Sequence, residues 1–202
     1  MRVLIACEFS GVVRDAFLAR GHDAWSCDLL PTEVLGPHIQ GDAVEAMKDG
    51  WDLVIAHPPC THLAVSGAAW FEDKRKDGRQ QEGIDLFMQF AACTTERYCI
   101  ENPVGIMSTL WRPPDQVIQP YYFGDEFQKT TCLWLKGLKK LIHVKADDLF
   151  DKGTHVDKGE MVRFASGRTM PKWYAEKRGD GHARSATFPG IARAMAEQWG
   201  GQ

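Results

Sequence analysis

The sequence predicts an α/β fold with a mostly parallel sheet, and two observations lead to that prediction. Short apolar runs of β-prone residues alternate with stretches whose apolar residues recur at helical spacing. Strands that alternate with helices form parallel sheets covered by helices on both faces. The second observation is size, because 202 residues with a 44% hydrophobic content suit one domain with a packed core. We therefore expect residues 1–202 to form a single domain.

The alternating elements follow one another in order along the first half of the chain. Apolar β-prone runs predict buried strands, and apolar residues at helical spacing predict the helices between them. Glycine and proline residues end these runs, as they commonly do at element boundaries. The strands are expected over residues 2–9, 24–27, 52–56 and 98–100. The helices are expected over residues 12–17, 43–48 and 84–92.

The last third of the chain is less regular. A strand is expected over residues 130–135 and a closing helix over 191–198. Between them, residues 146–184 are polar and glycine-rich, with basic residues interleaved with aromatic ones. This pattern suits contact with a nucleic-acid backbone and its bases, and it equally suits a solvated loop. We treat 146–184 as a possible small substrate-recognition insertion.

Composition and charge exclude several classes of protein. The formal net charge of −3 excludes a globally basic nucleic-acid binder, although a local basic face remains compatible with it. No apolar run reaches the length of a membrane span, and Glu8 interrupts the amino-terminal run too early for a secretory signal. The six cysteines show no CxxC pair, which indicates reduced thiols. We expect a cytoplasmic protein with no membrane partner.

The ends of the predicted strands carry the residues of chemical interest, because ligands of parallel sheets bind at the carboxyl ends of the strands. The turn Phe9-Ser10-Gly11 would let a ligand approach the backbone closely. The chain lacks the Gly-x-Gly-x-x-Gly pattern there, so a dinucleotide is not indicated. Asp28 ends the second strand, where an acid commonly accepts hydrogen bonds from ribose hydroxyls. The alternative for Asp28 is a turn or capping acid.

Cys60 is a candidate nucleophile. It follows Pro58 and Pro59, which fix the backbone directly after a buried strand and project the next side chain over the sheet edge. The alternative is a small buried residue, which is the usual role of a cysteine without a disulfide. His57, Cys60 and His62 could suggest a metal, but a structural zinc site needs four ligands and no second cluster accompanies them. We expect no metal.

Glu101 follows a strand that should lie beside the one leading to Cys60. A carboxyl partly buried there would have a raised pKa and could donate a proton near neutral pH. The alternative is a helix cap, because Asn102 and Pro103 also suit the start of a helix.

Taken in order, these motifs resemble those of the DNA cytosine-5 methyltransferases, in particular the short phage-type members of that family. The matching motifs are Phe9-Ser10-Gly11, Asp28, Gly41-Asp42, Pro59-Cys60 and Glu101-Asn102. The resemblance implies a Rossmann-like fold that binds S-adenosyl-L-methionine and carries a minimal target-recognition segment. It implies DNA as the partner and a set of residues that contact the cofactor. Those residues are Phe9, Ser10, Gly11, Asp28, Asp42, Pro58 and Thr187.

The resemblance also implies a mechanism. The Cys60 thiolate attacks carbon 6 of cytosine, which makes carbon 5 reactive toward a methyl sulfonium. Glu101 holds a proton at ring N3 and contacts the exocyclic amine, and this stabilises the intermediate electrostatically. Asn102 positions the Cys60 loop. On duplex DNA the base must first be flipped out of the stack.

The sequence departs from the family in the motif that normally binds a phosphate of the nucleic acid and the carbonyl of the target base. The family's Gln-x-Arg-x-Arg is represented here by residues 128–132, in which both arginines are lost. Lys129 or Arg163 is the expected substitute, and Arg168 and Lys172 are expected to contact the nucleic-acid backbone.

Three alternatives stay open. The same chemistry could act on a free cytidine nucleotide or on single-stranded nucleic acid, or the chain could be a non-catalytic protein of methyltransferase fold that binds nucleic acid. An exocyclic-amine methyltransferase carries an acid or amide before Pro-Pro and an aromatic residue after it, where this chain has His57 and Cys60. Because few residues remain for a recognition domain, we also expect weak specificity, a homo-oligomer or a recognition partner.

Overall fold

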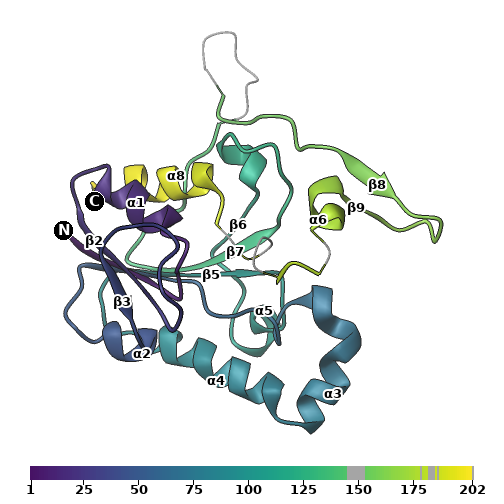
Figure 1. Ribbon diagram of the computed structural model, residues 1–202, viewed down its shortest axis with the longest axis horizontal. Helices are drawn as coiled ribbons and strands as arrows, with labels where there is room; N and C mark the ends of the chain where they lie inside the picture. Colours follow the sequence, from purple (N-terminus) through teal and green to yellow (C-terminus); the bar gives the residue numbers. More distant parts are fainter. Residues whose placement is uncertain (145–152, 178, 182–184, 186, 202) are drawn as a thin grey trace.

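The structure is a computed structural model that describes residues 1–144, 153–177, 179–181, 185 and 187–201. A seven-stranded sheet lies at its centre, with helices on both faces (Figure 1). The predicted α/β class with a mostly parallel sheet is therefore confirmed.

The sheet has the strand order β3-β2-β1-β4-β5-β7-β6. All neighbours are parallel except those of β7, which runs antiparallel to both β5 and β6. The first five strands follow the order of a doubly wound Rossmann-like sheet, in which the order reverses between β1 and β4. The strands are Arg2–Ala6 (β1), Asp23–Asp28 (β2), His38–Gln40 (β3), Leu53–Ala56 (β4), Tyr98–Pro103 (β5), Gln116–Ile118 (β6) and Thr131–Lys136 (β7).

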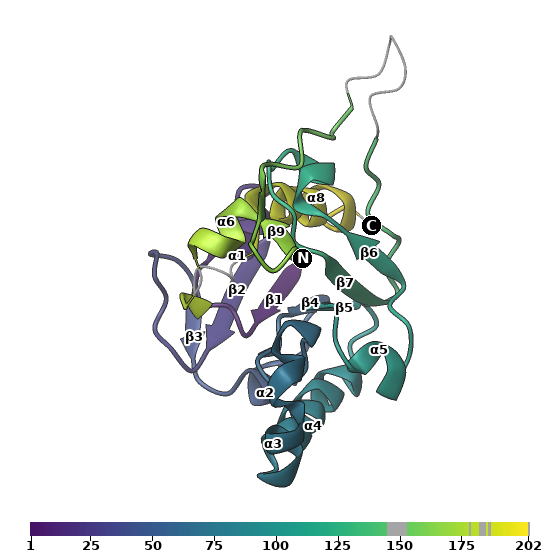
Figure 2. The same cartoon turned by 90° about the vertical axis from the view of Figure 1, so that its right-hand side faces the viewer.

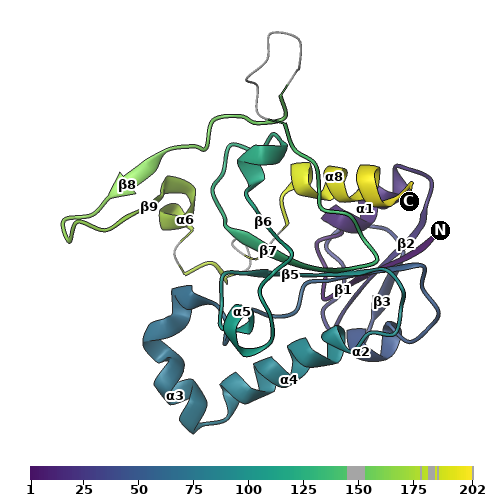
Figure 3. The same ribbon diagram turned by 180° about the vertical axis from the view of Figure 1, so that it is seen from behind.

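Helices cover the two faces of this sheet and bury a separate apolar cluster on each. Helices α1 (Val12–Leu18) and α8 (Pro189–Trp199) pack side by side on one face. The short α2 (Ala43–Ala46), the long α4 (Arg79–Ala91) and α5 (Met107–Leu110) cover the other. Figure 3 shows the same two layers from behind.

Two further groups of elements lie outside these layers. The 3-10 helix η1 (Val65–Trp70) and helix α3 (Phe71–Lys76) follow the loop after β4, and η2 (Pro120–Phe123) follows β6. Strands β8 (Met161–Arg163) and β9 (Thr169–Pro171) form an antiparallel hairpin, which helix α6 (Lys172–Glu176) follows directly. The hairpin and α3 extend on the same side of the molecule (Figures 1 and 3).

The expected strands and helices all form, with small shifts of their ends, but β3, β6 and the β8–β9 hairpin are absent from the sequence prediction. The strand expected over 98–100 continues to Pro103, because β7 pairs with it along its whole length. Glu101 and Asn102 therefore lie within a strand, and the alternative in which they begin a helix is wrong.

The six cysteines all lie in the described part of the chain, and none of them forms a disulfide. Over the same part of the chain, no helix combines the length and the apolar character needed to cross a membrane.

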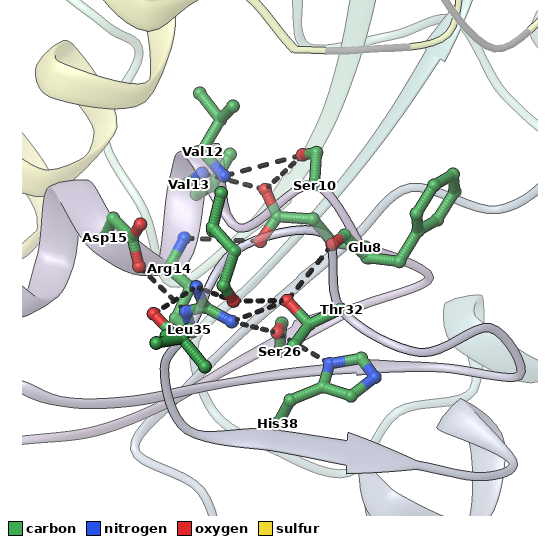
Figure 4. A network of polar contacts seen from close by, with 12 residues as sticks. Glu8, Ser10, Val12, Val13, Arg14, Asp15, Ser26, Thr32, Leu35 and His38 are labelled. Atoms are coloured by element: carbon green, nitrogen blue, oxygen red, sulfur yellow. Dashed lines mark hydrogen bonds and ion pairs between the residues drawn. The ribbon is translucent and has the colours of Figure 1, made fainter.

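A buried arginine ties the loop after β2 to the first turn of the protein (Figure 4). The Arg14 side chain has no exposed surface, and it donates hydrogen bonds to the hydroxyls of Ser26 and Thr32, both at 3.1 Å. It also donates to the carbonyl of Val34 at 3.3 Å and forms an ion pair with Asp15 at 2.8 Å. A buried guanidinium is tolerated only when its donors are satisfied in this way.

We expect replacement of Arg14 by methionine to lower the free energy of unfolding by about 3–5 kcal/mol, because it leaves buried acceptors without their donor. Chemical denaturation measures this change. Arg20→Ala is the control, since Arg20 is half exposed and its ion pair with Glu197 should contribute less than about 1 kcal/mol. Equal losses in the two variants would show that the Arg14 network does not stabilise the fold.

Candidate active site

The residues that follow the parallel strands meet along one edge of the sheet, which we call the carboxyl edge. It is formed by the loops after β1, β2, β3 and β4 and by the end of β5. In Figure 2 this edge faces the viewer, with α6 above and α3 below it. Because the strand order reverses between β1 and β4, this is the position at which sheets of this kind bind ligands.

The turn after β1 contains a buried carboxylate that occupies the start of helix α1. One oxygen of Glu8 accepts the backbone N–H of Val13 at 2.8 Å, and the other accepts that of Arg14 at 3.2 Å. The Ser10 hydroxyl donates to the first of these oxygens at 3.3 Å. The amino end of a helix is where a phosphate would bind, and here an internal carboxylate already takes its N–H groups. The turn is therefore closed to a phosphate group.

Glycine is required in this turn for a reason other than the one the sequence suggests. Gly11 has a φ of 77°, and a Cβ there would lie 2.5 Å from Nη2 of Arg14 and 2.6 Å from Val34. The space beside Gly11 is thus filled by the chain itself. The packing of Arg14 and Val34 therefore requires glycine at position 11, and Gly11 lies with Phe9 and Ser10 in the loop after β1 at the carboxyl edge.

Asp28 ends β2 and Asp42 follows the neighbouring strand β3, and the charges of both act on the thiol of Cys7. Burial, and then the charges of Asp28, Cys27 and Asp42, raise the pKa of the Cys7 thiol to about 12, so that thiol stays neutral. Each aspartate uses Oδ1 to accept a backbone N–H, that of Leu30 at 3.0 Å and that of Val44 at 2.8 Å.

The second oxygen of each aspartate makes no hydrogen bond within the described residues. Two carboxylates at the ends of neighbouring strands can accept hydrogen bonds from vicinal hydroxyls such as those of a ribose. The structure therefore places Asp28 and Asp42 at the carboxyl edge as the residues that could accept hydrogen bonds from the sugar of a nucleoside.

The loop that carries Cys60 is held by a side chain from the next strand. The side-chain amide of Asn102, which is buried, donates to the carbonyl of Pro58 at 2.7 Å. The carbonyl of Cys60 accepts the N–H groups of Leu63 and Ala64, both at 2.9 Å, which closes a turn directly after the cysteine. The position of Cys60 is thus fixed from both sides, by β5 and by the turn.

A buried lysine, which the sequence did not single out, supports the same loop. Lys74 of α3 donates to the carbonyl of Thr61 at 2.6 Å, and it is one of few buried lysines or arginines in the described chain. The contact attaches α3 to the segment that follows Cys60. No local pattern predicts it, because α3 is short and carries charges along its whole length.

Glu101 forms a hydrogen-bonded pair with His57, which directly follows β4. The distance between Nδ1 of His57 and Oε2 of Glu101 is 3.1 Å, and both side chains are about nine-tenths buried. Burial favours the neutral carboxyl, but the hydrogen bond from His57, together with the charges of Lys129 and His57, outweighs it and lowers the pKa of Glu101. The predicted upward shift of this pKa is therefore wrong, and Glu101 is ionised at neutral pH.

Lys129 is a predicted substrate-binding residue whose charge helps to lower the pKa of Glu101. It precedes β7, donates to the carbonyl of Ser185 at 3.2 Å and lies 5.8 Å from the centre of the Phe188 ring. Thr187 precedes Phe188 and helix α8. The start of that helix is fixed by Asp125, which accepts the N–H of Gly190 at 2.7 Å.

The other three predicted substrate-binding residues lie on the β8–β9 hairpin and at the start of α6. Arg163 and Arg168 are exposed on the β8–β9 hairpin. Lys172 is paired with Glu160 at 2.7 Å and lines a cavity of about 420 Å³ whose other charged residues are acidic. Lys172 is consequently the least suited of the three to contact a phosphate.

A larger cavity, of about 620 Å³, lies at the opposite edge of the sheet, where both termini are found (Figure 1). Trp51, Asp52 and Arg97 line it, and it contains no combination of nucleophile and proton donor. We therefore locate the candidate site by its chemistry and not by the size of this cavity. In the described residues no group of three or more histidine, cysteine or acidic side chains is arranged to hold a metal.

Comparison of the chain with protein-family models gives no match, and comparison with curated protein sequences gives none either. The function is therefore argued from the fold and from the arrangement of side chains at the carboxyl edge.

The lowered pKa of Glu101 has a measurable consequence for stability. The stabilisation that comes from its ionised form is fully present above the unfolded value of about 4.5 and is lost as the pH falls through the lower folded value. We expect the difference in unfolding free energy between wild type and Glu101→Gln to shrink as the pH is lowered from 6 to about 3.

Denaturation at several pH values measures this difference, with Glu45→Gln on the exposed side of α2 as the control. A difference that grows toward acid would contradict the lowered pKa.

Proposed function

We propose that this chain is an S-adenosyl-L-methionine-dependent methyltransferase that modifies carbon 5 of cytosine in DNA through a covalent adduct with Cys60. One observation carries the proposal. The side-chain amide of Asn102, in β5, donates a hydrogen bond to the carbonyl of Pro58, in the loop that carries the candidate nucleophile Cys60. The residue before Asn102 in the same strand is Glu101, a buried carboxylate. A nucleophile and a carboxyl group carried on two segments that are fixed to one another are what addition to a cytosine ring requires.

The cofactor side of the carboxyl edge supports a donor that lacks phosphate. Glu8 occupies the amino end of α1, which argues against a dinucleotide, while Asp28 and Asp42 fit the hydroxyls of a ribose. These carboxylates also suit a ligand that carries an ammonium and a sulfonium. When bound there, S-adenosyl-L-methionine supplies an electrophilic methyl group.

The residues of this chain account for the remaining steps. The Cys60 thiolate forms a bond to carbon 6, and the electron pair displaced from the ring moves to N3, which takes up a proton from solvent. Carbon 5 is then nucleophilic and accepts the methyl group. Loss of the proton on carbon 5 to solvent is followed by departure of the thiolate and release of the N3 proton to solvent, which restores the ring and frees the enzyme.

Glu101 and Lys129 recognise the base in this scheme. An ionised Glu101 accepts a hydrogen bond from the exocyclic amine, which distinguishes cytosine from uracil or thymine. Lys129, on the same side of Glu101, provides a positive charge in place of the two missing arginines.

The arrangement of basic side chains favours a nucleic acid over a small substrate. The hairpin and α3 both lie on the side of the molecule that faces the viewer in Figure 2. Arg163 and Arg168 on the hairpin and Arg75 on α3 are exposed. Trp70, which is 64% exposed, lies between the Cys60 loop and α3 and offers a ring for base stacking. A duplex bound across this side would have to present its cytosine by base flipping.

The covalent step is tested with an oligonucleotide that contains 5-fluorocytosine, which cannot lose a proton from carbon 5 and so retains the adduct. We expect wild type to form a stable adduct in the presence of the methyl donor, and Cys60→Ala to form none. Cys93→Ala is the matched control, because Cys93 is buried at the end of α4 and away from the carboxyl edge.

The other functions are distinguished by the same assay. An adduct that forms only with single strands, or only with a cytidine nucleotide, would show that this molecule and not duplex DNA is the substrate. An adduct that persists in Cys60→Ala would show that Cys60 is not the nucleophile. Absence of both adduct and methyl transfer in wild type, with DNA binding retained, would identify a non-catalytic binding protein.

The DNA contact of the hairpin is tested by the salt dependence of binding. Each phosphate contact contributes about −0.9 to the slope of log K against log salt concentration for duplex DNA. We expect Arg163→Ala/Arg168→Ala to make that slope shallower by about 1–2 units. Lys139→Ala/Lys140→Ala is the control, since these exposed lysines follow β7 at the opposite edge. An equal slope in the hairpin variant and in wild type would show that Arg163 and Arg168 do not contact DNA phosphates.

A further inference from the structure

We propose that the cavity beside helix α6 and the β8–β9 hairpin binds a polyamine, that is, a linear aliphatic amine that carries two or three positive charges. The cavity has a volume of about 420 Å³, which lies in the range of sites that take small organic ligands. The inference goes beyond the proposed function and does not depend on it.

Three segments of the chain form the walls of this cavity. Helix α6 contributes Trp173 and Glu176, and the loop before β8 contributes residues 157–160. Residues 126–127, which follow η2, complete it. Figures 1 and 3 show α6 beside the hairpin.

These walls are fixed to one another without a ligand. Nε1 of Trp173 donates to the carbonyl of Gln128 at 3.1 Å, which attaches α6 to the segment after η2. Gly159 has a φ of 78°, and a Cβ there would lie 2.5 Å from the carbonyl oxygen of Glu126. The loop before β8 therefore lies directly against the same segment. Because the cavity is already formed, little ordering opposes the entry of a ligand.

The charges in the cavity select a cation with more than one positive charge. Lys172 is the one basic residue of its lining, and its ammonium is paired with Glu160 at 2.7 Å. Three further acidic residues line the cavity, namely Glu126, Asp157 and Glu176. The carboxylates of Glu126 and Glu176 make no hydrogen bond with any residue that the structure describes. A lysine side chain of another protein would bring one charge to these three carboxylates, whereas a polyamine brings two or three.

Aromatic residues make an organic cation more suitable than a metal ion. The rings of Phe127 and Trp173 have centroids 5.7 Å apart and an interplanar angle of 75°, and both residues line the cavity. The face of an aromatic ring attracts an ammonium group, and it also packs against the methylene groups of an alkyl chain. A metal ion gains nothing from the methylene contact, and in the described residues no side-chain group is arranged to hold one.

The test is isothermal titration calorimetry of the full chain with spermidine at low ionic strength. We expect wild type to bind one spermidine and Glu126→Gln/Glu176→Gln to bind it about 10-fold more weakly, because two ion pairs are lost. Both glutamates are exposed, so the replacements should leave the fold intact. Absence of spermidine binding by wild type overturns the proposal.

Glu45→Gln/Glu197→Gln is the matched control, since it removes the same charge from exposed positions on α2 and α8. We expect this variant to bind spermidine as wild type does. Equal losses in the two double variants would show attraction to the net charge of the protein and would overturn the site.

Two further titrations test the organic character of the ligand. Phe127→Leu keeps an apolar side chain but removes the ring, and it should weaken spermidine binding by about 2–5-fold. An unchanged affinity would contradict a ligand that lies against this ring. Magnesium chloride at matched ionic strength should not displace spermidine, and stoichiometric displacement would identify a divalent-cation site instead and overturn the proposal.

NMR locates the ligand without any variant that alters the cavity. We expect spermidine to shift the signals of the Trp173 indole N–H and of the Gly159 amide, because both residues line the cavity. Trp173→Phe assigns the indole signal. Shifts confined to the carboxyl edge, with these two signals unchanged, would show that the polyamine binds elsewhere and would overturn the proposal.

Discussion

Strand β5 lies between β4 and β7 and is hydrogen-bonded to both, and the candidate site depends on this arrangement. Pairing with the antiparallel β7 extends β5 through Glu101 and Asn102 to Pro103, beyond the point at which β4 has ended. The two polar residues therefore stand at the edge of the sheet on a rigid element, beside the loop that begins at His57. A site built on a strand is held more precisely than one built on loops alone.

Buried charge shapes the neighbouring loops after β1 and β2 in the same way. Glu8 accepts the N–H groups at the start of α1, and Arg14, from the first turn of that helix, holds the loop after β2. Each group would be costly to bury alone. Glu8 is satisfied mainly by backbone N–H groups, and Arg14 by hydroxyls, the Asp15 carboxylate and a backbone carbonyl. As a result, the first turn is occupied by the Glu8 carboxylate and is closed to a phosphate group. This argues against a dinucleotide more directly than the missing glycine motif does.

The sequence predicts those parts of the fold that have a strong local signal. Strands β1 and β4 and helices α4 and α8 are recognisable because their apolar residues follow a clear period. The three-residue strands β3 and β6 are not recognisable, because such short pieces form only when a longer neighbour offers a hydrogen-bonding edge.

The electrostatics of the site are the part that sequence reasoning could not supply. Glu101 and His57 are 44 residues apart, and the sign of the carboxyl's pKa shift depends on that contact and on Lys129. Burial alone would raise the pKa of Glu101, which is the shift predicted from the sequence. The presence of a histidine before Pro58 was the available signal, but nothing local indicates that its ring turns toward β5.

The DNA contact proposed above would be small because of where the described charges lie. The hairpin carries the exposed Arg163 and Arg168, whereas Lys172, directly after its second strand, is paired with Glu160 and lies beside other acidic groups. In the proposed complex, the arginines of the hairpin and the exposed Arg75 of α3 would provide two separate contacts with a phosphate backbone. Two short contacts that flank a base-binding site can orient a duplex, but they read few base edges. Sequence selectivity in such a protein must come largely from the ease with which a given cytosine leaves its stack.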